Sequence, residues 1–239
     1  MRLLVTRPHL DAGETARALE ARGHEVLTEP VLDIVLEDRP PLDLDGVQAF
    51  LATSRNGVRA LARATPRRDL PLLAVGRSSA ALAHESGFLD VRDADGDVND
   101  LGRLAVAALD PAAGALLHAA GTETAGDLKG DLERRGFKVR REVLYRAVEC
   151  ERFSPGTARA LTDRRIDAVL FFSPRSAEAF ARVLENMNLT SVVEGVVAFC
   201  ISRRTAEMAR ILPFGEVVSA ARPNQDALLS CLDGHGVGE

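Results

Sequence analysis

One kind of strand-to-helix turn recurs along this chain. Each copy follows a short apolar run, opens a helical pattern, and holds small hydroxyl residues or glycine with an arginine nearby. The copies are Thr6-Arg7-Pro8, Thr53-Ser54-Arg55-Asn56, Gly76-Arg77-Ser78-Ser79, Ser173-Pro174-Arg175-Ser176 and Ser202-Arg203-Arg204-Thr205. The alternation of strands and helices predicts parallel sheets with right-handed crossovers. In such sheets these turns gather backbone N–H groups and positive helix ends at one edge, where anions bind.

The same layout occurs twice, which indicates an internal duplication. The segment Arg22–Val26 matches Arg135–Val139 around a glycine that ends a helix. Each segment follows a predicted strand and helix, at Leu3–Val5 and Asp11–Arg22 in the first half and at Ala115–His118 and Thr124–Arg135 in the second. The turns at Ser54 and Ser173, and those at Gly76 and Ser202, match in the same order. The chain therefore repeats an α/β half of about five strands.

Two extended stretches are longer than usual. Val26–Glu37 and Val139–Glu149 are each about twice the five or six residues of an ordinary strand. Pro30 argues that the first is not a central strand throughout, because proline has no N–H for the ladder. A strand of this length can leave one sheet and cross to another folded part of the chain. A strand followed by a surface loop is the alternative.

Composition excludes several classes of protein. The chain has 239 residues, enough for one large core or two smaller ones, and a net charge of −5. That charge, one tyrosine and no tryptophan argue against nonspecific nucleic-acid binding and base stacking. Three separated cysteines and five histidines show no metal or catalytic-triad spacing, so we expect reduced thiols and no metal site. The first apolar run is too short for a signal peptide, and none approaches the roughly 20 residues of a membrane span, so we expect a cytoplasmic protein.

The order and spacing of the turns resemble the uroporphyrinogen-III synthase family. The resemblance runs from Leu3 to about Leu232 and rests on Thr6-Arg7-Pro8 with Gly23 and Pro30, Thr53-Ser54-Arg55, Val75–Ala80, Leu144-Tyr145-Arg146, Phe172-Ser173-Pro174 and Ser202–Ala206. The chain departs from the family at three places. Ser202 stands for the usual glycine, Ser79 stands for the commoner threonine, and the turn Ala120–Ala125 lacks basic residues often found there.

The resemblance implies two Rossmann/flavodoxin-like parallel-sheet α/β domains joined by a two-stranded linker, with the duplicated halves interdigitated. It assigns residues 1–34 and 149–239 to one discontinuous domain and residues 38–142 to an inserted one. Residues 35–37 and 143–148 are then the connecting strands. It also implies a substrate cleft between the domains of a monomer.

The activity implied is cyclisation of hydroxymethylbilane, a linear tetrapyrrole, to uroporphyrinogen III. Water is lost and the last ring is inverted, with no cofactor or metal. Tyr145 is the catalytic candidate, because a phenol can donate a hydrogen bond to the leaving hydroxyl. A half-buried strand residue is the alternative for Tyr145. The substrate-binding candidates are Arg7, Thr53, Ser54, Arg55, Gly76, Ser79, Gly121, Ser173, Arg175, Ser202 and Thr205. Among them, Ser54, Ser173 and Thr205 are also expected as helix N-caps.

Two other functions stay open at this stage. One is a two-domain receptor that clamps a small anionic ligand without chemistry. The other is a transferase with two Rossmann-like domains that uses a nucleotide sugar, although no acidic ribose-binding residue is evident at a strand end. The chain also lacks a dinucleotide G-x-G-x-x-G, a P-loop and a G-x-S-x-G nucleophile elbow.

Overall fold

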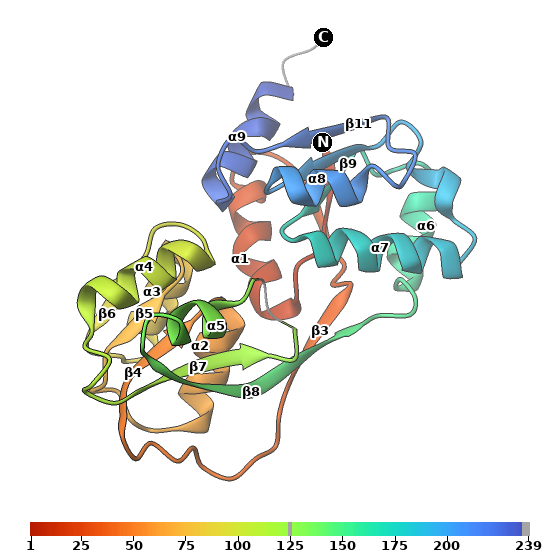
Figure 1. Cartoon of the computed structure of the whole chain (residues 1–239). Helices are drawn as coiled ribbons and strands as arrows, with labels where there is room; N and C mark the ends of the chain where they lie inside the picture. Colours follow the sequence, from red (N-terminus) through yellow and green to blue (C-terminus); the bar gives the residue numbers. More distant parts are fainter. Residues whose placement is uncertain (124–125, 236–239) are drawn as a thin grey trace. The chain divides into compact units, whose positions relative to one another are not determined.

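The computed structural model describes residues 1–123 and 126–235 (Figure 1). The fold is α/β and is built on two largely parallel sheets, which confirms the predicted fold class. The chain divides into two compact units. Unit 1 comprises Met1–Asp33 with Val148–Glu239, and unit 2 comprises Ile34–Ala147.

The sheet of unit 1 has five strands in the order β11-β10-β9-β1-β2, and all neighbours run parallel. The strands are β1 (Arg2–Val5), β2 (Glu25–Thr28), β9 (Ala168–Phe171), β10 (Val197–Cys200) and β11 (Glu216–Ser219). The helices are α1 (His9–Glu20), α6 (Pro155–Thr162), α7 (Pro174–Asn186), α8 (Arg203–Ala209) and α9 (Gln225–His235), with a short 3₁₀ helix at Thr190–Val193. The central strands β9 and β10 are apolar throughout because helices cover both of their faces.

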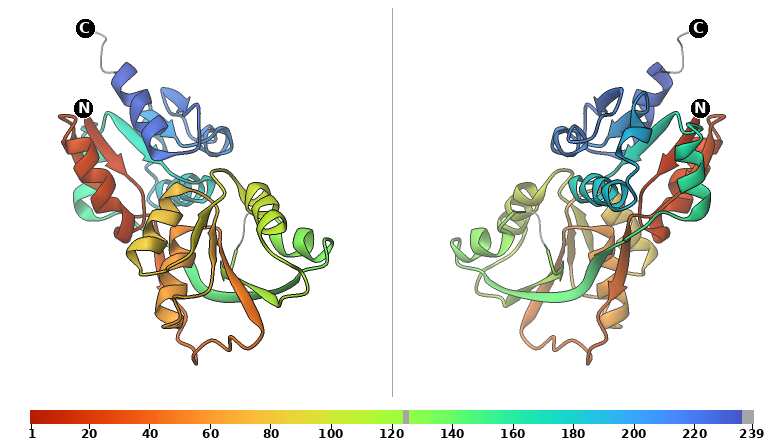
Figure 2. Two further views of the ribbon diagram at one scale, coloured as in Figure 1. Left: turned by 90° about the vertical axis from the view of Figure 1, so that its left-hand side faces the viewer. Right: turned by 90° about the vertical axis from the view of Figure 1, so that its right-hand side faces the viewer.

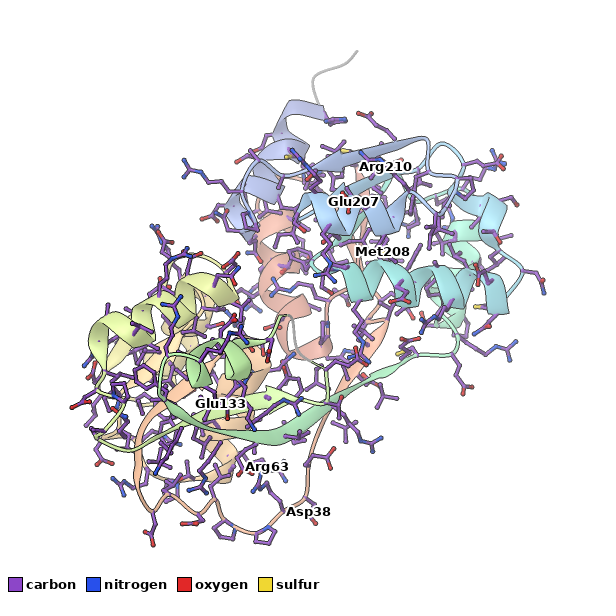
Figure 3. All side chains as sticks on the ribbon, viewed as in Figure 1. Asp38, Arg63, Glu133, Glu207, Met208 and Arg210 are labelled. Carbon is purple, nitrogen blue, oxygen red and sulfur yellow. The ribbon has the colours of Figure 1, made fainter. Side chains whose placement is uncertain are left out.

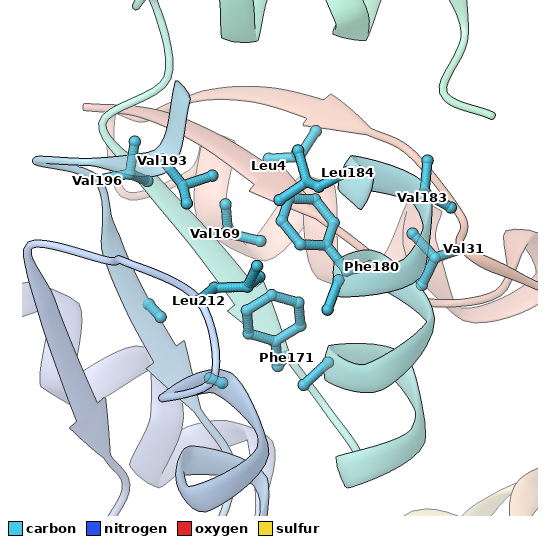
Figure 4. Close-up of a cluster of buried hydrophobic side chains, with 14 of the residues drawn as sticks. Leu4, Val31, Val169, Phe171, Phe180, Val183, Leu184, Val193, Val196 and Leu212 are labelled. Atoms are coloured by element: carbon cyan, nitrogen blue, oxygen red, sulfur yellow. The ribbon is translucent and has the colours of Figure 1, made fainter. Parts of the chain in front are cut away.

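Alternation along the strands of unit 1 creates two cores. Leu3 and Val5 belong to the core under α1 and α9, whereas Leu4 belongs to the core under α6, α7 and α8. In the second core the ring centroids of Phe171 and Phe180 lie 5.3 Å apart, and the two rings meet edge to face (Figure 4). On α8, Met208 packs against that core while Glu207 is exposed, as is Arg210 at the C-cap of the helix (Figure 3). The helix is therefore held by one apolar face.

The sheet of unit 2 has six strands in the order β3-β8-β7-β4-β5-β6. The strands are β3 (Leu32–Leu36), β4 (Val47–Ala52), β5 (Leu72–Ala74), β6 (Val91–Asp93), β7 (Ala115–Gly121) and β8 (Lys138–Glu149). The helices are α2 (Arg55–Ala64), α3 (Arg77–Glu85), α4 (Val98–Ala108) and α5 (Leu128–Glu133). Figure 2 shows the sheet between α2 with α3 on one face and α4 with α5 on the other, which agrees with its two buried clusters.

The two sheets repeat one topology. The order β11-β10-β9-β1-β2 in unit 1 corresponds to β6-β5-β4-β7-β8 in unit 2. In each five-strand repeat, two strands and the helix between them come from one half of the sequence, and the other three strands come from the other half. The duplication visible in the sequence therefore appears as two units that each combine parts of both halves.

The two long stretches behave differently. Val26–Glu37 is divided into β2 and β3, which belong to different sheets, and Pro30 lies in the break, as its missing N–H predicts. Val139–Glu149 lies in the single strand β8 of 12 residues. The hydrogen bonds from Cys150 N to the oxygen of Val31 and from Glu37 N to that of Leu144 make β3 antiparallel to β8.

One predicted helix begins later than expected. The pattern predicts a helix at Thr124–Arg135, but α5 starts at Leu128. Gly126 has a φ of 74°, which is not helical, and the Asp127 side chain caps α5 by accepting a hydrogen bond from Gly130 N. Thr124 and Ala125 lie outside the described residues.

A histidine lies inside the core of unit 2. His118 on β7 is 2% exposed, and burial, followed by the nearby charge of Arg141, lowers its pKa to about 4. Its Nε2 lies 3.4 Å from Thr53 Oγ1. Within residues 1–123 and 126–235, its buried Nδ1 has no hydrogen-bond partner. The folded protein therefore holds His118 neutral at pH 7.

This burial predicts a loss of stability in mild acid. The unfolded chain takes up the proton near pH 6.5 and the folded chain only near pH 4, so stability falls as the pH drops through that window. We expect His118 to account for about 2–3 kcal/mol of the fall in the free energy of unfolding between pH 7 and pH 4.5. Urea unfolding at pH 7 and pH 4.5 should show a smaller difference for His118→Leu than for the unchanged chain. His84→Leu, at an exposed position of α3, is the control. An equal pH dependence in all three proteins would contradict the prediction.

Candidate functional site

The carboxyl ends of the parallel strands define one edge of each sheet. In unit 1, the helices that follow β1 and its neighbour β9 cover opposite faces, and in unit 2 the same holds for β7 and its neighbour β4. Open α/β sheets generally bind ligands at the strand ends beside such a reversal. We call these two positions the unit 1 switch point and the unit 2 switch point.

Arg7 occupies the unit 1 switch point directly after β1. Its guanidinium donates hydrogen bonds to Gln225 Oε1 at 2.7 Å and to Thr15 Oγ1 at 3.1 Å. It also lies 3.7 Å from an Asp11 carboxylate oxygen and 4.4 Å above the ring of Phe172. The side chain is 15% exposed. These contacts tie the ends of β1 and β9 to α1 and α9, and binding of substrate by Arg7 stays a prediction.

Serines cap three of the helices that begin at the carboxyl ends of the strands, one in unit 2 and two in unit 1. Ser54 Oγ accepts a hydrogen bond from Gly57 N, and Ser173 Oγ accepts one from Ser176 N, so both are N-caps as predicted. The prediction was wrong for Thr205. The cap of α8 is Ser202, which accepts from Thr205 N, and the buried Thr205 hydroxyl lies 3.0 Å from Ser202 Oγ. Arg175, in the first turn of α7, is half-buried.

Gly76 caps α3 with an extended backbone, at a φ of −168°. A Cβ at this position would meet nothing closer than 4.0 Å, so the turn does not require glycine. Ser202 has the same extended backbone at the matching turn of unit 1. The departure from the family pattern at Ser202 therefore leaves the geometry of the turn intact.

The other predicted residues of unit 2 lie around the starts of α2 and α3. Arg55 Nη1 donates to Ser78 Oγ at 3.1 Å, which joins the first turns of the two helices. Ser79 is buried in α3. Arg77 pairs with Asp95 on the exposed surface. Thr53 contacts His118 from the end of β4.

Three predicted residues meet at the unit 2 switch point. The Tyr145 hydroxyl, on β8, lies 2.9 Å from Ser54 Oγ. Gly121 pairs with Tyr145 across β7 and β8, next to an irregularity in the register. A Cβ on Gly121 would lie 2.9 Å from two ring carbons of Tyr145, so glycine is needed for the ring to lie there. The half-buried tyrosine is thus held between a helix cap and a glycine.

Sequence reasoning missed two residues of this cluster. Arg141 Nη2 donates to the carbonyl oxygens of Gly121 at 2.6 Å and Thr122 at 2.9 Å, and so holds the turn after β7. Gly57 brings the first turn of α2 against β7, because a Cβ would lie 2.7 Å from the Ala119 oxygen. Glycine within a helix lowers stability relative to alanine. A glycine in the first turn of a predicted helix can therefore indicate that another backbone approaches there.

Neither a metal centre nor a membrane span occurs within residues 1–123 and 126–235. These residues contain no group of three or more histidine, cysteine, aspartate or glutamate side chains arranged to hold a metal ion. None of the helices in these two segments is both long and apolar enough to cross a membrane.

Comparisons with known proteins agree with the fold and the order of the turns. A family model described as uroporphyrinogen-III synthase HemD matches residues 13–230. Uroporphyrinogen-III synthetase from Helicobacter pylori 26695 is 17% identical with a TM-score of 0.67, and the match covers 98% of this chain and 100% of that one. A mutant uroporphyrinogen III synthase from the bacterium Thermus thermophilus is 22% identical with a TM-score of 0.56, covering 99% and 97%.

At these identities the solved structures show a shared fold. None of the curated proteins compared with the chain matches it. The family model, however, spans most of the chain and includes every predicted turn except the first. The chain belongs to the uroporphyrinogen-III synthase family, whose role is the cyclisation of hydroxymethylbilane in haem biosynthesis.

Proposed function

We propose that Tyr145 assists departure of the terminal hydroxyl when this synthase converts hydroxymethylbilane to uroporphyrinogen III. The observation that supports this most directly is the 2.9 Å contact between the Tyr145 hydroxyl and Ser54, at the unit 2 switch point. Phenols are weak acids, so the role we assign is hydrogen-bond donation to the leaving oxygen rather than full proton transfer. Departure of the hydroxyl leaves an azafulvene cation. Attack by the substituted carbon of the far ring then gives a spiro intermediate, which fragments and recombines.

The remaining catalytic contribution is conformational. The two ends of one flexible molecule must be brought together, and such orientation can supply on the order of 7–11 kcal/mol. The substrate carries acetate and propionate groups on every ring. We propose that first-turn N–H groups and hydroxyls at the strand ends bind these carboxylates, because helix N-termini bind anions without burying a second full charge.

The binding candidates divide by their contacts. Ser54, Ser173, Ser202 and Gly76 each cap a helix at the strand ends. In the proposal, Arg55 and Arg175 add charge beside these caps. Thr205 and Ser79 are buried, so their contribution is through the turn that they stabilise. Arg7, Thr53 and Gly121 shape the ends of the switch-point strands.

We further propose that the enzyme acts as a cytoplasmic monomer. In this proposal residues 1–34 with 149–239 and residues 38–142 are its two domains, and residues 35–37 and 143–148 connect them. The division of the chain into two compact units supports the proposed domains. Light scattering of the purified protein would measure its mass in solution.

The isomer of the product tests the activity itself. We expect the purified chain to convert hydroxymethylbilane to the inverted type III isomer faster than the spontaneous reaction gives type I. Chromatography of the oxidised products separates the two isomers. Type I alone, at the spontaneous rate, would contradict the enzymatic function and favour a binding protein for an anionic ligand.

Tyr145→Phe tests the tyrosine. Removing one hydrogen bond to a developing charge should lower kcat by about tenfold to a hundredfold, with the melting temperature nearly unchanged. Gly121→Ala should lower kcat as well, since its Cβ would displace the ring.

Gly156→Ala is the control for the glycine substitution, because a Cβ there meets no atom within 4 Å. We expect its turnover to match that of the unchanged chain. Full turnover by Tyr145→Phe would remove the phenol from the mechanism.

A further inference from the structure

Three polar side chains form a row across the sheet of unit 2, close to the carboxyl ends of its strands. His118 on β7 pairs with Leu51 on β4 and with Arg141 on β8. Thr53 follows β4, two residues after Leu51, and its Oγ1 lies 3.4 Å from His118 Nε2. We call Thr53, His118 and Arg141 the polar row.

The polar row interrupts an apolar face of the sheet. Leu51, Leu116 and Val139 belong to the core under α4 and α5, and each lies two residues before a member of the row. Side chains two residues apart on a strand share a face, so the row continues this apolar face toward the strand ends. A leucine in place of His118 would extend the core. Packing alone therefore does not explain a histidine here.

We propose that His118 is a positioning residue, which donates its Nε2 proton to Thr53 Oγ1 and so leaves the Thr53 hydroxyl proton for a substrate carboxylate. The inference rests on the proposed function, in which hydroxyls at the strand ends bind the acetate and propionate groups of hydroxymethylbilane. An ionised carboxylate only accepts hydrogen bonds. Thr53 can bind one only if its proton is not already donated to His118, so the direction of this contact decides the role of the threonine.

The burial of His118 selects the direction. A neutral imidazole carries one N–H, on Nδ1 or on Nε2. Nδ1 is buried and has no hydrogen-bond partner within the described segments 1–123 and 126–235. It is therefore an unpaired N–H in one form and an unpaired lone pair in the other, and unpaired buried N–H groups are the rarer of the two in proteins. A proton on Nε2 is paired with Thr53 Oγ1, so we expect this form.

Arg141 keeps the imidazole neutral. Its Nη2 donates to the carbonyl oxygens of Gly121 at 2.6 Å and Thr122 at 2.9 Å, which anchors the guanidinium on the strand beside His118. Burial, and after it the charge of Arg141, lowers the pKa of His118 to about 4. An imidazolium would carry a proton on both nitrogens, so the neutral ring is what allows Nδ1 to stay without one.

Thr53 lies where its proton is useful. The residue is half-buried, and among the residues that the structure describes His118 is the only group that hydrogen-bonds its hydroxyl. Its neighbour Ser54 is the N-cap of α2, and helix N-termini bind anions. A carboxylate bound at this helix start is therefore close to a hydroxyl whose proton is left available by His118.

The tautomer of His118 is measured directly and without substrate. Proton–nitrogen correlation NMR spectra of the imidazole rings at pH 7 distinguish a protonated ring nitrogen from an unprotonated one. We expect the His118 ring, identified by the signals that His118→Leu loses, to carry its proton on Nε2. A proton on Nδ1, or on both nitrogens, would overturn the proposal.

Substitutions test whether His118 acts through Thr53. Thr53→Val removes the hydroxyl and keeps nearly the same shape, and His118→Leu removes the donor. We expect each single change to raise KM about threefold to tenfold with kcat within about twofold, because a binding contact is lost. The double variant should have no larger KM than Thr53→Val alone, because coupled residues do not contribute independently. His118→Gln, whose amide N–H can donate from about the place of Nε2, should restore most of the lost affinity.

His84→Leu, at an exposed position of α3, is the matched control and should keep the KM of the unchanged chain. KM effects that add in the double variant would make His118 a purely structural residue, and an unchanged KM in Thr53→Val would remove the threonine from binding. Either result overturns the inference, while formation of the type III isomer leaves the proposed function standing. Type I alone would contradict the proposed function, and this inference with it, whatever the tautomer.

Discussion

Parallel strand pairing is the constraint on which the rest of the structure depends. Within each five-strand repeat it directs all strands toward one edge of their own sheet, and a helix that directly follows one of these strands in the same unit begins at that edge. Helix caps, first-turn N–H groups and switch points are all consequences of that arrangement. A substrate with many carboxylates suits such an edge, because each helix start can bind one without a dedicated buried cation.

The two switch points use this shared geometry differently. In unit 1 the position after β1 is taken by Arg7, whose guanidinium is engaged by Gln225, Thr15 and Asp11. In unit 2 the strand β7 ends at Gly121, and the ring of Tyr145 lies against that glycine. Duplication supplied two equivalent edges. The side chains that lie there differ: one edge has the Arg7–Asp11 ion pair, and the other has the Tyr145 hydroxyl, for which we propose a catalytic role.

Features set by local sequence could be predicted. The turns, the strand before each of them and the break at Pro30 follow from apolar runs, caps and missing N–H groups. Contacts made by strand pairing could not. The approach of Arg141 to the turn after β7 depends on the register of β7 and β8. Glycine is required at Gly57 and Gly121 because atoms of other elements lie where a Cβ would be. Thr205 was mistaken for a cap because the serine three residues earlier competes for the same role.

The central claim is that carboxylates bind at the carboxyl edges of the two sheets. Backbone amide shifts, recorded by NMR while reduced uroporphyrinogen III is added, test it most directly. The account predicts the largest shifts in the first turns of α2, α3, α7 and α8, at Arg55, Arg77, Arg175 and Arg203. It predicts little change at Gly23, Gly87 and Gly195, which precede strands at the opposite edges. Shifts confined to those glycines, or none at the helix starts, would contradict it.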